Sequence, residues 1–308
     1  MDKEYYLGID GGATKTTFAL ANDSGEIIKV LKKSSSNPFD IGCEKACEVI
    51  RAGINEVLSE FNIDKSMVNV FAGISGGTSG NNKDIIADYF KNSGFKTFRN
   101  GSDLESIVSA GLPDGNGVAV IMGTGSSAFI KVGNELKRLG GYGYLFSAGG
   151  CGYGLGSSAI RSALMSEDGS GEQTIIRDLI LNETKHKTVL EDLQYFYDIG
   201  KKGVASFAPI VITAFKKGDK VAKKIIVENM QQVANLIFRG GNLIKNEKKI
   251  KVILVGGLTN EIDLLMPFIK EELSKFKSDR EYEINVFDGD VVKGALTVAG
   301  LKKEIKYA

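Results

Sequence analysis

The sequence predicts a duplicated α/β protein of two lobes with a cleft between them. Three observations support this fold class. A buried strand, a glycine turn and a second strand open the chain at LGIDGGATKTT (7–17), and a similar segment, VIMGTGSS (120–127), follows about one domain length later. Strands and amphipathic helices alternate in both halves, and a third glycine-ended strand, VILVGGLTN, covers 252–260. Clefts between domains are common small-molecule sites, so the site is expected there.

The first half is expected to run β-β-β-α-β-α-β-α. Short connections join its first three strands, which indicates an antiparallel meander. The helix over 40–61 carries apolar residues at helical spacing. The strands are expected at 5–10, 16–21, 24–33, 67–74 and 95–98, and the helices at 83–92 and 104–110 besides 40–61.

The second half restarts the pattern at Gly117 with strand, glycine turn, strand, turn and strand. Residues 160–232 are mostly helical in pattern, and their apolar surface is expected to serve as core and dimer interface. Strands at 248–255 and 281–287 and helices at 261–276 and 291–301 complete the chain. The predicted lobes are 1–117 plus 293–308, and 118–292 with a helical insertion.

Composition excludes several classes of function. The net charge of +1 offers no basic surface for nucleic acid or membranes, and no apolar run approaches the roughly 20 residues that span a bilayer. The N-terminus lacks a secretion signal, and three cysteines fit a reducing compartment, so a cytoplasmic protein is expected. The single histidine, His186, excludes sites built on several histidines.

The turn DGGATKT is predicted to bind phosphate. It lacks the spacing of a P-loop around Lys15, and a strand rather than a helix follows it. A glycine-rich hairpin turn can instead aim successive N–H groups at one anion. Asp10, at the end of the strand, is expected to hold Mg²⁺, usually through water. The phosphate ligands are expected to be Gly11, Gly12, Thr14, Lys15 and Thr16.

Two further glycine turns match this one. In IMGTGSS the expected phosphate ligands are Thr124, Gly125 and Ser126, so that two turns could clamp a polyphosphate. In VGGLTN a strand ends in glycines at a helix start, where missing side chains allow a flat ligand to approach the backbone. Gly256, Gly257 and Asn260 are therefore expected to bind nucleotide. A single such turn could simply close a buried strand; three in this order favour a nucleotide site.

The order DGGATKT, GTGS, VGGLTN resembles the sugar kinase, heat-shock ATPase and actin superfamily. Within it the chain is most similar to the N-acetylglucosamine kinase and BadF-type ATPase family, over essentially its whole length. The resemblance implies a duplicated ribonuclease H-like (actin-like ATPase) fold that binds ATP and Mg²⁺ between lobes that close on substrate. It also implies phosphorylation of an N-acetylated amino sugar, at the 6-hydroxyl for members that act on N-acetylglucosamine, and a homodimer is expected.

Asp103, in RNGSDLES, is the candidate catalytic residue. Helix capping is the commonest role for an aspartate at such a junction. Ser102 and Glu105 already form an S-x-x-E capping box, however, which leaves Asp103 in the first turn. The helix dipole there favours the ionised carboxylate. The resemblance implies that Asp103 also contacts the sugar and accepts its hydroxyl proton.

The resemblance also implies the sugar-binding residues, and it shows one departure. Asn37 matches the family's sugar-binding asparagine, a position also typical of a turn before Pro38. Thr124 is expected to contact sugar as well as phosphate, and Gly140, Gly141 and Tyr142 match a loop along the N-acetyl group. Relatives commonly carry two acids where this chain has Ala148 and Gly149.

Loss of these two acids removes negative charge and opens space, which favours an anionic or bulkier sugar. The expected substrates are therefore N-acetylmuramic acid, N-acetylglucosamine, or both, with Ala148 beside the sugar and a role in the salvage of cell-wall sugars.

Two other classes stay open. A BadF-type activator ATPase would couple ATP hydrolysis to electron transfer, with cysteines holding an iron–sulfur cluster between subunits. Cys151 has no second cysteine nearby, and Cys43 and Cys47 fit small buried thiols on a helix. A non-catalytic actin-like or sugar-sensing protein would need neither Asp10 nor Asp103.

Overall fold

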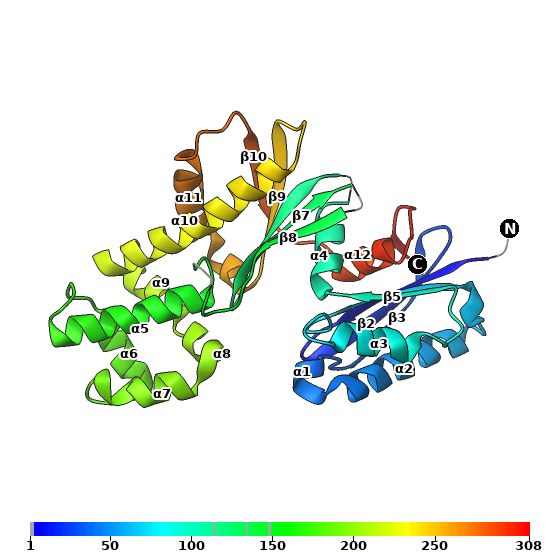
Figure 1. Cartoon of the computed structure of the whole chain (residues 1–308), viewed down its shortest axis with the longest axis horizontal. Helices are drawn as coiled ribbons and strands as arrows, with labels where there is room; N and C mark the ends of the chain where they lie inside the picture. The colour runs from blue at the N-terminus through cyan, green and yellow to red at the C-terminus, as the bar shows by residue number, and fades with distance from the viewer. Residues whose placement is uncertain (1–2, 114, 134, 147–148) are drawn as a thin grey trace. The chain divides into compact units, whose positions relative to one another are not determined.

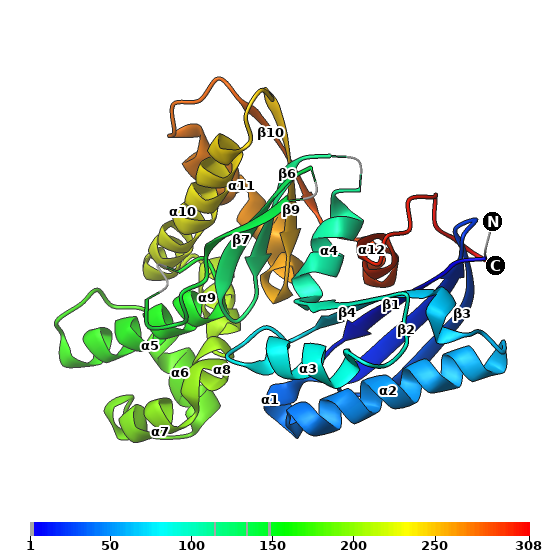
Figure 2. The same cartoon turned by 45° about the vertical axis from the view of Figure 1, so that its right-hand side comes forward.

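The computed structural model describes residues 3–113, 115–133, 135–146 and 149–308. Its contacts divide the chain into two units (Figures 1 and 2). Unit 1 is Met1–Asp114 with Asp288–Ala308, and unit 2 is Gly115–Phe287. The predicted lobes have slightly different boundaries, at 117/118 and 292/293. That these lobes close on substrate stays a prediction.

Unit 1 contains a six-stranded sheet in the order β11-β3-β2-β1-β4-β5. The strands are β1 (Tyr5–Gly11), β2 (Lys15–Asn22), β3 (Glu26–Ser34), β4 (Val68–Ile74), β5 (Thr97–Gly101) and β11 (Lys306–Tyr307). β1, β2 and β3 form the predicted antiparallel meander, while β1, β4 and β5 are parallel. The carboxyl ends of those three strands therefore meet at one edge of the sheet.

Helices cover both faces of this sheet. The helices of unit 1 are α1 (Pro38–Ile41), α2 (Cys43–Glu60), η1 (Lys65–Met67), α3 (Asn82–Phe90), α4 (Asp103–Gly111) and α12 (Val291–Val298). α2 and α3 lie along one face, and α4 and α12 along the other (Figure 2). Side chains alternate across a strand, so Phe18 packs in the core under α2 while Ala19 packs with Leu296 of α12.

Unit 2 repeats the strand order of unit 1. Its sheet runs β10-β9-β6-β7-β8, with an antiparallel meander from β6 to β8 and with β6, β9 and β10 parallel. The strands are β6 (Gly117–Met122), β7 (Ser126–Val132), β8 (Glu135–Gly140), β9 (Lys249–Val255) and β10 (Glu281–Val286). The predicted duplicated ribonuclease H-like fold is thereby confirmed.

The additional mass of unit 2 is helical, as predicted. The helices are α5 (Gly152–Asp168), α6 (Ile176–Thr184), η2 (Leu190–Asp192), α7 (Leu193–Asp198), α8 (Gly200–Ala205), α9 (Ala208–Lys216), α10 (Lys220–Leu243), η3 (Gly257–Glu261) and α11 (Ile262–Ser274). α10 packs on β6 and β7 and also contacts α5, α9 and α11 (Figure 1). In the part of the chain that the structure describes, no helix is long and apolar enough to cross a membrane.

Several predicted boundaries were wrong. The single helix expected over 40–61 is broken at Gly42, whose φ of 83° suits glycine and separates α1 from α2. The strand expected at 95–98 is β5 and extends to Gly101. Helix α5 begins at Gly152, well before the helical pattern predicted from residue 160, although glycine disfavours helices.

The close packing of α12 on α4 gives a stability prediction. A Cβ built at Gly294 would lie 1.9 Å from the carbonyl oxygen of Ser106, so Gly294→Ala must push two helices apart. We expect the free energy of unfolding in urea to fall by about 3 kcal/mol. Gly115→Ala is the control, because no atom of the described residues lies within 4 Å of a Cβ there. Equal stability of both variants would contradict the close packing of these helices.

Candidate active site

The predicted phosphate turn of unit 1 is a tight hairpin between β1 and β2. The N–H of Gly12 donates to the carbonyl of Lys15 at 3.0 Å. A Cβ at Gly11 would lie 2.4 Å from Oγ of the fully buried Ser36, so any other residue would have to displace that hydroxyl. Thr14 and Lys15 are exposed at the turn. The turn therefore presents one hydroxyl and one ammonium group to solvent.

Thr16 is placed differently from Thr14. Its side chain is fully buried, and its Oγ1 donates to the carbonyl of Ser34 at 2.7 Å and contacts Oγ of Ser36 at 2.9 Å. A buried hydroxyl with two partners is not available to a ligand without rearrangement. The hydroxyl of Thr16 thus fixes the start of β2 to Ser34 and Ser36. Phosphate binding by the other residues of this turn stays a prediction.

Asn37 is connected to the same turn by hydrogen bonds of the Ser35 hydroxyl. The hydroxyl of Ser35 donates to the carbonyl of Gly12 at 3.1 Å and accepts from the N–H of Asn37 at 3.1 Å. Oδ1 of Asn37 accepts from the N–H of Phe39 at 2.9 Å and caps α1. This is the turn role expected before Pro38; the residue is 9% exposed, and its Nδ2 makes no hydrogen bond to the described residues.

Asp103 begins α4 at the carboxyl edge of the parallel strands. The predicted capping box is confirmed: Oγ of Ser102 accepts from Leu104 N–H at 3.2 Å, and Glu105 accepts from Ser102 N–H at 3.2 Å. Asp103 is not wholly free of the helix end, because its Oδ1 accepts from Ser102 Oγ and Leu104 N–H, each at 3.0 Å. These bonds orient the carboxylate, and Oδ2 accepts no hydrogen bond from the residues that the structure describes.

Asp10 and Asp103 meet around Gly73. Asp10 pairs with Gly73 across β1 and β4, and a Cβ on Gly73 would lie 3.4 Å from Cα of Asp103. Burial raises the pKa of Asp10 to about 6, with further increases from Asp103 and Asp290 and an opposing effect of Lys15. The edge of the sheet is thus a region of crowded negative charge.

Asp290 is a member of this group that sequence reasoning missed. It is the N-cap of α12, where its Oδ1 accepts from the N–H of Val292 at 3.1 Å, and Oδ2 accepts from the hydroxyl of Tyr307. That hydrogen bond raises the pKa of Tyr307 to about 12. The pattern DGDVV signals a helix cap, and nothing local places this carboxylate near a residue 280 positions earlier.

Among the described residues no group of three or more His, Cys, Asp or Glu side chains is placed to hold a metal ion, so Asp10 alone would be the protein ligand of the predicted magnesium ion. Carboxylate oxygens are the ligands that Mg²⁺ prefers, usually with several waters retained. Asp10 is half-buried, and its ionised form is disfavoured by burial and by two neighbouring carboxylates. A bound cation would compensate this charge, so the donor chemistry suits the predicted magnesium site.

The predicted phosphate turn of unit 2 repeats the arrangement of the first. The N–H of Gly123 donates to the carbonyl of Gly125 at 3.1 Å, and the N–H of Gly152, at the start of α5, donates to the carbonyl of Gly123 at 2.8 Å. Thr124 is exposed, whereas Ser126 is buried and its hydroxyl donates to the carbonyl of Gly149. Each turn therefore has one exposed and one anchored hydroxyl.

VGGLTN lies directly against this turn. A Cβ at Gly256 would lie 2.7 Å from the carbonyl carbon of Met122 and 2.9 Å from the nitrogen of Gly123, and its φ is 116°. Gly257 faces open space, and Asn260 is exposed on η3. The structure thus brings the second and third predicted nucleotide segments together within unit 2.

The predicted sugar loop closes a cavity of about 200 Å³. Gly140 and Gly141 have φ of 75° and 74°, Tyr142 is 71% exposed, and Arg138 donates to the carbonyl of Gly141. Ala148 lies outside the described residues. The lining consists of Ser126, Leu139, Gly140, Gly141, Tyr142, Phe146, Gly149, Gln232, Asn235, Leu236 and Arg239.

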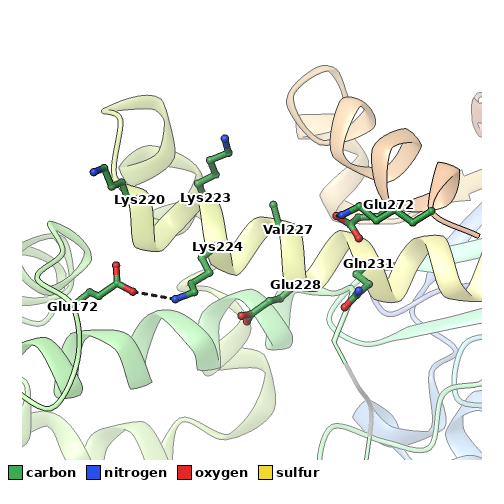
Figure 3. A pocket seen from close by; sticks show the side chains of 9 residues that line it. Glu172, Lys220, Lys223, Lys224, Val227, Glu228, Gln231 and Glu272 are labelled. Carbon is green, nitrogen blue, oxygen red and sulfur yellow. Dashed lines mark hydrogen bonds and ion pairs between the residues drawn. The ribbon is translucent and has the colours of Figure 1, made fainter.

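A larger hollow of about 560 Å³ lies elsewhere in unit 2, along the first half of α10 (Figure 3). Its lining is Glu172, Lys220, Lys223, Lys224, Val227, Glu228, Gln231, Glu272 and Lys275. Lys224 and Glu172 form an ion pair at 3.0 Å, and both are exposed. This hollow is an open surface lined by four lysines and three glutamates, and its lining includes none of the predicted site residues that the structure describes.

Asn229 of α10 supports the cavity from behind. This residue is 5% exposed; its Oδ1 accepts from the N–H of Gly150 at 3.0 Å, and its Nδ2 donates to the carbonyl of Ile225 at 3.0 Å. It therefore fixes the segment that accepts the hydroxyl of Ser126. Sequence reasoning missed it because the hydrogen bond joins residues 79 positions apart.

Removal of this support is expected to loosen the segment. Asn229→Ala leaves the N–H of Gly150 buried without its partner, so the free energy of unfolding should fall by about 2 kcal/mol. Amide exchange at Gly150 should also become faster. Gln231→Ala, on an exposed position of the same helix, is the matched control. Unchanged exchange at Gly150 in the Asn229 variant would argue against this role.

Comparisons with known proteins cover almost the whole chain. The profile of the BadF/BadG/BcrA/BcrD ATPase family matches residues 7–294. The N-acetylmuramic acid/N-acetylglucosamine kinase of Clostridium acetobutylicum is 28% identical over 305 residues, 96% of this chain and 98% of that protein. The N-acetyl-D-glucosamine kinase of Dictyostelium discoideum is 26% identical over 89% of this chain and 91% of its own.

Solved structures agree with the duplicated fold. A Chromobacterium violaceum protein assigned as an N-acetylglucosamine kinase superposes with a TM-score of 0.69 at 19% identity, over 96% of this chain and 99% of its own. At this identity the likeness supports the actin-like ATPase fold alone.

Proposed function

Because this chain belongs to the BadF/BadG/BcrA/BcrD ATPase family, we propose that it uses ATP to phosphorylate an N-acetylated amino sugar. The substrates are N-acetylmuramic acid, N-acetylglucosamine, or both, phosphorylated at the 6-hydroxyl in the salvage of cell-wall sugars. The similarity over 96% of the chain to a kinase named for both sugars supports this assignment. The observation that carries it is the available Oδ2 of an oriented Asp103 beside Asp10 and the glycine turn.

Asp103 is the proposed catalytic base. Phosphoryl transfer depends mainly on positioning and charge compensation, so a carboxylate that accepts the hydroxyl proton is sufficient. Oδ1 holds its orientation at the start of α4, and Oδ2 is the acceptor. Asn37 would donate its Nδ2 to a sugar hydroxyl, and Gly140, Gly141 and Tyr142 would line the N-acetyl group.

The glycine turns are the proposed phosphate ligands. N–H groups of Gly11, Gly12 and Gly125, with the exposed hydroxyls of Thr14 and Thr124, would bind phosphate oxygens. Lys15 would add a positive charge near the phosphates. Mg²⁺, held through Asp10, would neutralise phosphate charge when bound. The roles of the buried Thr16 and Ser126 are to fix these turns.

The nucleotide base is proposed to lie against VGGLTN. Within the described residues, Gly257 has no neighbouring atom within 4 Å of the position a Cβ would take, so a flat ring could approach its backbone. Asn260, exposed on η3, would donate to or accept from the nucleotide.

The assembly is proposed to be a cytoplasmic homodimer. The apolar and aromatic side chains of Leu190, Tyr195 and Tyr197 are exposed by 64%, 47% and 75% on η2 and α7, which supports a protein interface there. All three cysteines are free thiols, which supports a reducing compartment. Sedimentation of the purified chain measures the oligomeric state.

The activator ATPase is the competing function within this family. Cluster ligation requires thiolates, and burial raises the pKa of Cys47 to about 12 and raises that of Cys151. Both thiols are buried, and they belong to different units. The chemistry of these cysteines therefore supports the kinase over the activator.

The test is release of ADP from MgATP with and without each amino sugar, followed by NMR analysis of the product. We expect release to depend on the sugar, to yield a 6-phosphate and to fall about a thousandfold in Asp103→Asn. Release that ignores both sugar and substitution would overturn the kinase, and iron in the purified protein would favour the activator.

A further inference from the structure

We propose that the cavity of unit 2 is a subsite for a carboxylate-bearing substituent of the sugar, and that Arg239 is its ionic partner. The inference deepens the proposed function and rests on it, because the cavity shares Ser126, Gly140 and Gly141 with the predicted site. It identifies which group of this chain distinguishes an anionic amino sugar from a neutral one.

The size of the cavity suits a substituent better than a whole ligand. It measures about 200 Å³, whereas pockets that enclose a complete small molecule start near about 300 Å³. The cavity opens beside Gly140 and Gly141, the loop proposed to lie along the N-acetyl group. A sugar placed on that loop would therefore direct a side group, rather than its ring, into the cavity.

One face of α10 supplies the polar wall. Gln232, Asn235, Leu236 and Arg239 line the cavity at i, i+3, i+4 and i+7, the spacing of a single helix face. Nε of Arg239 lies 3.4 Å from Oδ1 of Asn235 one turn earlier, which directs the guanidinium. Two amides and one guanidinium thus line the same wall.

The charge of the cavity is positive. Within the described ranges no aspartate or glutamate lines it, and Arg239 has no acidic partner there. Arg138 lies at Gly141, and it too lacks an ion pair in the part of the chain that the structure describes. A guanidinium without a carboxylate partner is a ready site for a carboxylate ligand, which it can bind through two parallel hydrogen bonds.

The backbone conformation and the surroundings of Gly149 disfavour an acidic side chain at this position of the cavity wall. The φ of this glycine is 114°, and a Cβ there would lie 2.9 Å from Oδ1 of Asn229. An acidic side chain at this position would therefore need both a strained backbone and a shift of a buried amide. The geometry keeps this part of the lining free of negative charge where Arg239 meets a ligand.

Apolar and aromatic residues also line the cavity. Leu139, Leu236, Tyr142 and Phe146 belong to the same lining as Arg239. A substituent with both a methyl group and a carboxylate satisfies this combination, and the lactyl ether of N-acetylmuramic acid has both. N-acetylglucosamine, which lacks the ether, would leave the cavity to water.

The test compares kcat and KM on the two sugars for the wild type, Arg239→Gln and the control Arg161→Gln, which changes an exposed arginine of α5. We expect Arg239→Gln to raise KM for N-acetylmuramic acid about 10-fold. Its parameters on N-acetylglucosamine should stay within about 2-fold. The derivative of N-acetylmuramic acid in which the lactyl carboxylate is a carboxamide should have the same KM in the wild type and in Arg239→Gln, since it lacks the charge that Arg239 binds.

Equal losses on both sugars, or an unchanged KM for the anionic one, would overturn the subsite. A wild type that phosphorylates the neutral sugar but neither binds nor phosphorylates the anionic one would overturn the subsite while leaving the kinase intact. Calorimetric binding of both sugars separates the two proposals. Binding of the anionic sugar that depends on Arg239, without phosphorylation, would retain the subsite and overturn the kinase.

Discussion

Asp103→Asn is expected to lower kcat for the amino sugar about a thousandfold. Asparagine has nearly the same shape and can still accept the N–H of Leu104, so the start of α4 should keep its structure. It cannot accept the proton of the attacking hydroxyl, and this is the function assigned to Oδ2. KM for the sugar should change little, because the substitution removes only the interaction with the reacting proton.

Glu105→Gln is the matched control for this substitution. It removes one negative charge from the same helical turn and weakens the capping box and the ion pair with Arg99, which measures 2.8 Å. Its kcat should stay within a few-fold while stability falls by up to about 1 kcal/mol. If Asp103→Asn retained a tenth or more of wild-type kcat, the residue would be a positioning group and not the base.

Asp10→Asn is expected to stabilise the ligand-free protein and to lower kcat at least about a hundredfold. The pKa of Asp10 is raised to about 6 in the folded chain from an ordinary value of 3.8. An acid with a raised folded pKa destabilises the folded state once it ionises, so wild-type stability falls as pH rises from about 4 through 6. Above that range the cost is about 1 to 3 kcal/mol, and asparagine removes it.

Urea unfolding at pH 4.5 and pH 7.5, without metal, measures this effect. The variant should exceed the wild type in unfolding free energy at pH 7.5 and approach it at pH 4.5. Added Mg²⁺ should stabilise only the wild type, and kcat of the variant should fall at least about a hundredfold. Asp23→Asn, at an exposed turn of unit 1, is the control. A variant less stable than wild type at pH 7.5 would contradict the assigned electrostatics.

Local patterns predicted the strands and most helices because they reflect burial. Nearly continuous buried runs mark β1 and β2, which are covered on both faces, and helical spacing of apolar residues marks α2. The same reasoning predicted helix boundaries wrongly at two glycines. At Gly42 a positive φ ends one helix, whereas Gly156 lies inside α5 because a Cβ there would come 2.0 Å from the carbonyl oxygen of Val204. Only tertiary contacts distinguish these two uses.

Site residues within a local sequence motif could be predicted. Site residues whose partners lie far away in the sequence were missed. The capping box at Ser102 is local and could be predicted. The partners of Thr16, the bond from Asn229 to Gly150 and the charge of Asp290 depend on residues far apart in the chain. Composition and residue spacing cannot predict these long-range contacts, because the contacts form only when strands and helices pack together.

The hydroxyl of Ser35 connects two binding events. It bonds the carbonyl of Gly12 in the phosphate turn and the N–H of Asn37 in the proposed sugar site. A ligand that orders either end would therefore lower the entropic cost of ordering the other. Nucleotide and sugar affinities should be linked by a single coupling free energy, equal in both directions by thermodynamic necessity. Each substrate should then raise the affinity for the other by the same factor, whichever of them binds first.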